Sequence, residues 1–421
     1  MGNREGEMMK ADLIINALVI ACCGEGKGAG TIENGYVAVK DGKIAALGEG
    51  SAPGDIKSPD TRIIDATGKT VTPGLIDAHT HLVHGGSREK ELPLKLKGVP
   101  YLEILKMGGG ILSTVRNTRE ASKEELKAKA RKSLDEMLLH GTTTVEAKSG
   151  YGLDFDTEIK CLEAAAELNA SHPVDIVSTY MGAHAVPEEF KGDTRGYIDF
   201  MCEKVMPYVK KNNLAEFMDV FCEEGVFSPE ESRTLMRKGK EQGFKLKIHA
   251  DEIIPLQGAE LAGEMGAVSA EHLVAASEEG IAAMAKSGVT AVLLPGTCFY
   301  LMLGKYAPAG KMMERGVRVA LATDYNPGTC PTENLQSVMT FACFGMRMTP
   351  EEIIKGMTLN AAHAVDRAGE IGSLEIGKKA DIVIFDAPNP EYIVYHFGIN
   401  HVDTVIKGGK TVVENRRIIA I

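Results

Sequence analysis

The sequence has no Cys-x-x-Cys pair, and its eight cysteines are spread over 421 residues. This spacing is not typical of a zinc ribbon, nor of the dense disulfide framework of a small secreted domain. We therefore expect reduced thiols, as in a cytoplasmic protein.

The sequence also lacks an apolar run of the kind that crosses a membrane. Residues 13–22 resemble the core of a signal peptide, but the run is short, Asn16 interrupts it and Asp12 precedes it. Because a spanning helix needs about 20 consecutive apolar residues, we expect a buried strand here and no membrane partner. The residues before Met9 are expected to form a poorly ordered leader.

An excess of positive charge is absent as well. The formal net charge is −11, whereas a nucleic-acid-binding surface needs a basic patch. The glycines at 108–110 are not followed by the Lys-Ser/Thr pair of a phosphate loop, so we interpret them as backbone of a substrate loop. The expected partner is a small molecule and not a nucleic acid.

What is present is a long alternation of apolar strands and helical stretches after residue 71. Helical runs follow the capping residues Ser122 and Ser228. The pattern predicts an α/β fold, a (β/α)8 TIM barrel over residues 71–371, with its chemistry at the carboxyl ends of the strands. The eight strand candidates lie within residues 71–86, 141–148, 175–181, 217–221, 244–249, 267–272, 289–294 and 317–324.

The two ends of the chain contain short strands without a barrel pattern. Residues 36–40 and 43–47 form a predicted hairpin around the turn Asp41-Gly42, and strands resume after residue 372. The simplest arrangement pairs the strands after residue 372 with the N-terminal strands. We therefore expect residues 1–70 together with 372–421 to form one small β-sandwich domain beside the barrel.

Polar residues recur at the ends of the predicted barrel strands. His79 and His81 lie two residues apart, so their side chains point to the same face of a strand. His249 ends the fifth strand and Asp324 ends the eighth. Three imidazoles and a carboxylate form a credible mononuclear metal site with room for water, so these four residues are the predicted ligands.

Several motifs resemble the amidohydrolase superfamily and, within it, the imidazolonepropionase family. The resemblance extends over nearly the whole chain in order, and the Gly-Gly-Ser-Arg-Glu-Lys and His-Ala-Asp-Glu motifs are its most specific parts. The matching stretches are residues 77–90, 108–116, 148–152, 181–185, 247–252, 293–296 and 322–328.

The resemblance implies a reaction and a set of catalytic residues. The family hydrolyses 4-imidazolone-5-propanoate to N-formimidoyl-L-glutamate, the third step of histidine degradation. Opening a cyclic amide needs an activated water, a proton acceptor and a group that stabilises the oxyanion. Glu252, His272 and Asp324 are the candidates for proton transfer and oxyanion stabilisation, and the sequence does not choose the general base among them.

Substrate-binding residues are implied in the same way. Arg88 offers a planar fork for the propanoate of the substrate. Tyr151 resembles the substrate tyrosine of the family, His184 is expected to contact the ring, and Tyr101 is either a further contact or a core residue. Donors to the carboxylates of the product are expected from Asn326, Gly328 and Thr329.

The expected cofactor is one metal ion per subunit, and the donor set suits zinc and iron equally. Lys148 ends the second strand, which raises the alternative of a carbamylated bridging lysine, but in binuclear relatives that lysine lies on another strand. The fourth strand here ends in Cys222-Glu-Glu-Gly, without a lysine. One metal is therefore expected, and Lys148 is interpreted as structural. His84 is given no role, and a homodimer is implied by the resemblance alone.

Two other interpretations remain open. A deaminase acting on cytosine or guanine would share the same histidine and aspartate skeleton, although a neutral base needs no carboxylate-binding Arg88. A non-catalytic scaffold acting through oligomer contacts would be expected to have lost metal ligands, and none is missing from the sequence.

Overall fold

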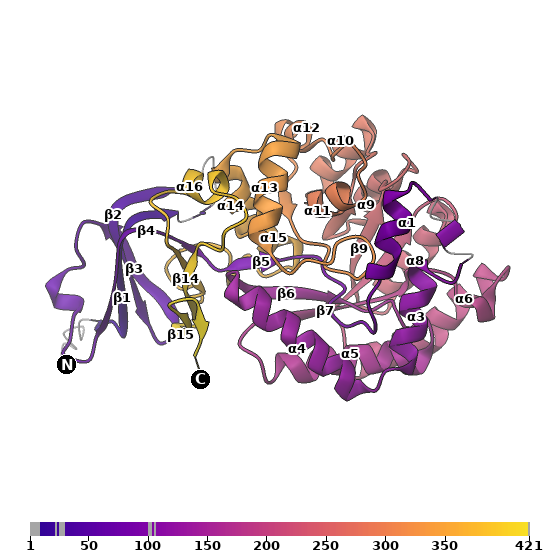
Figure 1. Ribbon diagram of the computed structural model, residues 1–421, viewed down its shortest axis with the longest axis horizontal. Helices are drawn as coiled ribbons and strands as arrows, with labels where there is room; N and C mark the ends of the chain where they lie inside the picture. Colours follow the sequence, from indigo (N-terminus) through magenta and orange to yellow (C-terminus); the bar gives the residue numbers. More distant parts are fainter. Residues whose placement is uncertain (1–8, 22, 25–29, 100–102, 105–106, 420–421) are drawn as a thin grey trace, which may run out of the picture.

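The computed structural model describes residues 9–21, 23–24, 30–99, 103–104 and 107–419. The candidate Tyr101 and the expected leader before Met9 lie outside the described residues. In Figure 1 the barrel occupies the right side of the molecule, and strands from both ends of the chain lie together on the left.

The barrel consists of eight parallel strands whose spatial order is their order in the chain. Each predicted strand is present, which confirms the TIM-barrel fold. A parallel bridge between Thr80 and Tyr325 joins the first strand region to the last, beside a 3.0 Å hydrogen bond from the backbone N–H of Asp324 to the carbonyl of His79. The strands are β5 (Leu75–Asp77), β6 (Thr142–Lys148), β7 (Asp175–Ala183), β8 (Phe217–Cys222), β9 (Lys245–Ala250), β10 (Ser269–His272), β11 (Thr290–Leu293) and β12 (Val319–Leu321).

Helices surround the barrel (Figure 1). The predicted starts at Ser122 and Ser228 are confirmed as capping boxes, in which each serine accepts the backbone N–H of a glutamate three residues later. The α-helices are α1 (Leu92–Leu96), α3 (Gly110–Glu120), α4 (Lys123–Leu139), α5 (Phe155–Asn169), α6 (Thr194–Phe200), α7 (Met206–Lys211), α8 (Pro229–Glu241), α9 (Gly258–Met265), α10 (Glu278–Ser287), α11 (Pro295–Tyr300), α12 (Ala309–Glu314), α13 (Leu335–Met346), α14 (Pro350–Gly356), α15 (Leu359–Ala364) and α16 (Pro390–Tyr395). Short 3-10 turns lie at η1 (Gly54–Ile56), η2 (Glu89–Glu91) and η3 (Glu188–Phe190), and a π-helical turn at η4 (Met201–Val205).

The main apolar core lies between the barrel strands and these helices. On α4 the buried residues Leu126, Ala130, Leu134 and Met137 recur every three or four positions, which places them on one helix face. Burying a side chain of this size stabilises the fold by roughly 1.5–3 kcal/mol relative to exposure. The packed core therefore holds the strand ends rigidly enough to position a site.

The described strands at the two chain ends form one eight-stranded sheet in the order β16-β15-β14-β13-β4-β1-β2-β3. Their bounds are β1 (Leu13–Ala21), β2 (Thr31–Lys40), β3 (Lys43–Glu49), β4 (Arg62–Pro73), β13 (Ile382–Phe385), β14 (Val402–Lys407), β15 (Lys410–Glu414) and β16 (Arg417–Ile418). The pairing of both chain ends is thus confirmed. The sheet curls, because Ile44 of β3 exchanges backbone hydrogen bonds with Gly377 and Lys378, just before β13. It thereby encloses an apolar core of its own.

The terminal sheet continues into the barrel through Gly74, which lies between β4 and β5. A Cβ at this position would lie 2.2 Å from Oγ1 of Thr143, so only glycine allows this approach. Domain boundaries at residues 70 and 372 remain a proposal. Among the described helices, none has the length and apolar character needed to span a membrane.

Candidate active site

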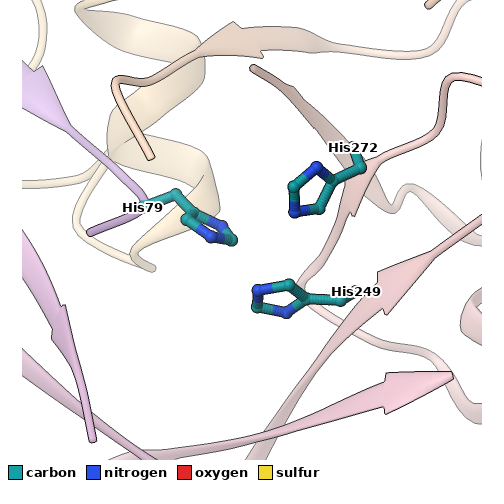
Figure 2. Close-up of side chains that lie close together, drawn as sticks. All are labelled: His79, His249 and His272. Carbon is teal, nitrogen blue, oxygen red and sulfur yellow. The ribbon is translucent and has the colours of Figure 1, made fainter. Parts of the chain in front are cut away.

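Four histidines and an aspartate meet at the carboxyl ends of the barrel strands. His79 follows β5 by two residues, His249 lies in β9 and His272 is the last residue of β10. Figure 2 shows the rings of these three histidines directed toward one another from separate strands. The centroids of the His79 and His249 rings are 4.6 Å apart, and those of His249 and His272 are 5.2 Å apart.

Potential ligand atoms of the described residues form four overlapping groups, each with its atoms within 4.8 Å of one another, and two of the four consist only of these histidines and Asp324. One group is His79, His249 and His272, and the other is His79, His81 and Asp324. Nε2 of His79 lies 3.4 Å from Oδ1 of Asp324, and Nε2 of His81 lies 3.7 Å from the same oxygen. The four predicted ligands are therefore gathered around one space, with His272 beside it.

The donor atoms suit a metal ion. Nε2 of His79 and Nε2 of His249 are buried and lack a hydrogen-bond partner among the described residues. Buried polar atoms without a partner are costly, whereas neutral imidazole is a good ligand for zinc or iron. Burial lowers the pKa of His249 to about 3 and keeps that ring neutral, as a ligand must be.

Asp324 is fixed by contacts on both sides. Its Oδ2 accepts a 2.6 Å hydrogen bond from the hydroxyl of Thr297, and its backbone N–H donates a hydrogen bond to the carbonyl of His79. Burial raises the pKa of Asp324 to about 7, so a bound cation would stabilise its charged form.

Three residues of the site have left-handed backbone conformations that are uncommon for side chains with a Cβ. The φ angles are +50° at Asp251, +69° at His272 and +57° at Asp324. Such conformations persist only where the surrounding structure holds them. Asp251 accepts backbone N–H groups of Leu256 and Gly258 within 3.0 Å, as a structural residue would.

Glu252 lies beside the histidine cluster. Its Oε2 is 3.6 Å from Nε2 of His272, and the side chain is 15% exposed. Burial, together with the charges of Asp324 and Glu223, raises the pKa of Glu252 to about 8. A carboxyl group with a pKa near neutrality can both accept and donate a proton.

Arg88 lies at the edge of the loop that follows Asp324. Its guanidinium donates two 3.0 Å hydrogen bonds to the carboxylate of Glu91, and a Cβ on Gly328 would lie 2.1 Å from its Nη1. Lys95 donates a 2.6 Å hydrogen bond to the carbonyl of Gly328. Asn326 accepts the backbone N–H groups of Gly328 and Thr329, both at 2.8 Å, so its amide shapes this loop.

Aromatic rings complete the site. The ring of His184 stacks on His81 at 4.8 Å with an interplanar angle of 14°, and Tyr151 lies 5.1 Å from His184. Nδ1 of His184 donates to the carbonyl of Gly150 at 3.0 Å. His84, which has no predicted role, is buried and donates from Nδ1 to the carbonyl of His81 at 2.9 Å.

Beneath the histidines lies a group of charged residues of which sequence reasoning considered only Lys148, as a structural residue, and missed the others. The sequence feature that could have revealed them is a charged residue within an otherwise apolar strand, because barrel strands are buried on both faces. Glu91, the partner of Arg88, was missed as well. The group beneath the histidines consists of Glu146, Lys148, Asp219, Lys247 and Glu271, all buried.

Comparison with known proteins decides the family. The sequence profile of the amidohydrolase family matches residues 70–412. Imidazolonepropionase of Treponema denticola is 63% identical over 385 residues, which cover 91% of this chain and 93% of that protein. The chain belongs to the imidazolonepropionase family. The imidazolonepropionases of Alkaliphilus oremlandii, at 59% identity over 93% of both chains, and Streptococcus sanguinis, at 56% over 94% of both, are further relatives.

Solved structures share the fold of this imidazolonepropionase family member at much lower identity. A zinc-bound adenosine deaminase of Xanthomonas campestris matches with a TM-score of 0.74 and 19% identity, over 98% of this chain and 95% of that one. A mutant atrazine chlorohydrolase of Arthrobacter aurescens in complex with zinc and atraton matches with a TM-score of 0.73 and 18% identity, over 97% of both chains. These neighbours confirm the barrel architecture. Family membership identifies the protein as a hydrolase, and the histidine and aspartate cluster supports a metal ion.

Proposed function

We propose that the protein hydrolyses the cyclic amide of 4-imidazolone-5-propanoate to N-formimidoyl-L-glutamate, the third step of histidine degradation. The observation that carries the proposal is the high identity with imidazolonepropionases over nearly the whole chain. The cluster of His79, His81, His249 and Asp324 at the barrel mouth supports it.

These four residues would hold one metal ion per subunit, zinc or iron. When bound, the ion supplies Lewis acidity that polarises the carbonyl and lowers the pKa of a coordinated water. The burial of the cluster supports this assignment, because a low-dielectric site strengthens such electrostatic effects.

The remaining chemistry is proton transfer and charge stabilisation by side chains. Water adds its oxygen to the ring carbonyl carbon, the carbon–nitrogen bond of the amide breaks, and a proton reaches the leaving nitrogen. Glu252, with its pKa near 8, is the proposed proton carrier. His272, 3.6 Å away, is placed to stabilise the oxyanion or hold the water, while Asp324 is the second candidate base.

The remaining residues of the site are proposed to bind and orient the substrate. The guanidinium of Arg88 binds the propanoate, with Glu91 holding one edge of the fork. Tyr151 and His184 contact the imidazolone ring. Asn326, Gly328 and Thr329 bind the product carboxylates through the loop that the Asn326 amide shapes. A cytoplasmic location and a homodimer complete the proposal.

The deciding experiment compares two reactions of the metal-loaded protein. Ring opening of 4-imidazolone-5-propanoate, with no ammonia release from cytosine or guanine, is the expected result. Deaminase activity without ring opening would contradict the proposal. A well-folded protein that is purified without metal and gains neither activity when metal is added would support a scaffold role.

The general base is identified by single replacements. Glu252→Gln, His272→Asn and Asp324→Asn are compared for turnover at several pH values and for bound metal. Asp324→Asn is expected to lose metal and turnover together, whereas Glu252→Gln is expected to keep metal and lose turnover. Nearly full turnover in Glu252→Gln would remove its proton-transfer role.

A further inference from the structure

Five charged side chains lie in the barrel interior beneath the histidine cluster. The side chains of Glu146, Lys148, Asp219, Lys247 and Glu271 are all fully buried. Charged residues are rarely buried without a partner, and burying them costs several kcal/mol per ion after relaxation. Such a group in the centre of a barrel therefore needs a physical explanation.

The ammonium of Lys148 lies at the centre of the group. Its Nζ is 2.7 Å from Oδ2 of Asp219 and 3.1 Å from Oε2 of Glu271. A third carboxylate, Glu146, lies 3.0 Å away. Without this cation three carboxylates would share one buried space, and their mutual repulsion would drive them apart or neutralise them.

The same carboxylate oxygens reach the histidines of the proposed metal site. Oδ2 of Asp219 lies 3.1 Å from Nδ1 of His249, and Oε2 of Glu271 lies 3.3 Å from Nδ1 of His79. The Asp219 oxygen therefore lies between the Lys148 ammonium and His249. The Glu271 oxygen lies between the ammonium and both imidazoles, because it is also 3.5 Å from Nδ1 of His249.

We propose that Lys148, through Asp219 and Glu271, positions His249 and His79 for metal binding. A carboxylate next to Nδ1 favours the tautomer with the proton on that nitrogen. Nε2 then carries the lone pair and is directed away from the carboxylate, toward the ligand cluster. Lys148 is thus a positioning residue that fixes the two carboxylates, and it is neither a ligand nor a catalytic group.

The other members of the group are consistent with this arrangement. Lys247 lies 3.1 Å from Glu146, and Ser269 donates a 2.6 Å hydrogen bond to the second oxygen of Glu271.

This inference rests on the proposed metal site, and its test separates the two. Asp219→Asn and Glu271→Gln preserve shape and remove one negative charge each, and Lys148→Met removes the ammonium. The rate at which each folded, zinc-loaded variant loses metal to a chelator is measured, and bound metal per chain is measured after dialysis. Because replacing such partners typically lowers metal affinity 10–100-fold, we expect at least about tenfold faster loss in each variant.

Asp381→Asn is the matched control. Asp381 is also a buried aspartate paired with a lysine, since it accepts a 2.6 Å hydrogen bond from Lys407, but it belongs to the terminal sheet, immediately before β13. Its replacement is expected to leave the rate of metal loss unchanged. Wild-type rates in Asp219→Asn and Glu271→Gln would overturn the positioning role, whereas a wild-type protein that binds no metal would overturn the proposed function itself.

A measurement on the unmodified chain tests the same inference independently of any variant. The protein is labelled with nitrogen-15 in histidine and loaded with an NMR-active cadmium isotope. The expected spectrum shows His79 and His249 coupled to cadmium through Nε2 with a proton on Nδ1, beside the coupling of the third proposed histidine ligand, His81. Coupling of those two rings through Nδ1 would overturn the inference.

Discussion

Gly328 and Arg88 are packed so closely that no side chain fits between them. A Cβ at position 328 would lie 2.1 Å from Nη1 of Arg88, while the opposite edge of the guanidinium is bound to Glu91. The loop after Asp324 and the loop after β5 therefore meet at the proposed carboxylate-binding residue. This relationship connects the metal ligands of two strands to substrate recognition.

Replacing Gly328 with alanine should therefore displace Arg88. We expect Gly328→Ala to raise KM about tenfold or more, since a charge-assisted hydrogen bond contributes roughly 1.5–3 kcal/mol, with a smaller change in kcat. Steady-state kinetics with 4-imidazolone-5-propanoate checks this. Gly310→Ala is the control, because a Cβ there meets nothing within 4 Å. An unchanged KM in Gly328→Ala would contradict the prediction, because displacement of Arg88 would then not affect substrate binding.

Arg88 itself should determine the preference for a carboxylate. Arg88→Met is expected to weaken the apparent affinity for the substrate by about 10–100-fold through loss of the charge-assisted contact. The measurement compares the substrate with an analogue in which a neutral amide replaces the propanoate. The wild type should prefer the carboxylate and the variant should not. An equal loss for both compounds would place Arg88 in a general structural role.

Glu252 should make the stability of the metal-free protein depend on pH. Burial raises the pKa of Glu252 to about 8 from an ordinary value of 4.5, so between these values the folded protein binds a proton that the unfolded chain releases. The free energy of unfolding should therefore fall as pH rises through this range. Urea unfolding at several pH values should show a shallower fall in Glu252→Gln, by on the order of 1 kcal/mol or more.

The control for this experiment is Glu314→Gln, which changes an exposed glutamate on α12. It should retain the pH dependence of the wild type. If Glu252→Gln also retains it in full, the Glu252 carboxyl group is ionised in the folded protein at neutral pH, and its assignment as a proton carrier with a pKa near 8 is wrong.

The helix cap at Ser228 offers a prediction about stability alone. Its side chain accepts the backbone N–H of Glu231 at the start of α8. Ser228→Ala should lower the free energy of unfolding by about 1 kcal/mol, and Ser228→Asp should restore most of it, because both serine and aspartate are good capping residues. Turnover should stay unchanged in both variants. A loss of turnover larger than the loss of folded protein would connect α8 to the site.

Much of the fold follows from local sequence patterns. The eight barrel strands were predicted from apolar runs between helical stretches, and the starts of α4 and α8 from the capping chemistry of Ser122 and Ser228. The curl of the terminal sheet was not predicted, since it depends on contacts of Ile44 with Gly377 and Lys378, more than 300 residues apart.

The site was predictable to the extent that its residues occur at strand ends. His79 and His81 were found by their spacing, and His249 and Asp324 by their positions after apolar runs. The partners of Lys148, by contrast, were not predicted, because Asp219 and Glu271 lie on other strands and meet it only in the closed barrel. Pairing across a barrel interior depends on strand register, which the sequence does not display.

The most direct test of the account is the metal dependence of one reaction. The protein is stripped of metal with a chelator, titrated with zinc or with ferrous iron, and assayed for conversion of 4-imidazolone-5-propanoate to N-formimidoyl-L-glutamate. The account predicts that the stripped protein is inactive and that activity rises with added metal to a maximum at one ion per chain. Full conversion by the stripped protein, or no conversion at any metal loading, would contradict it.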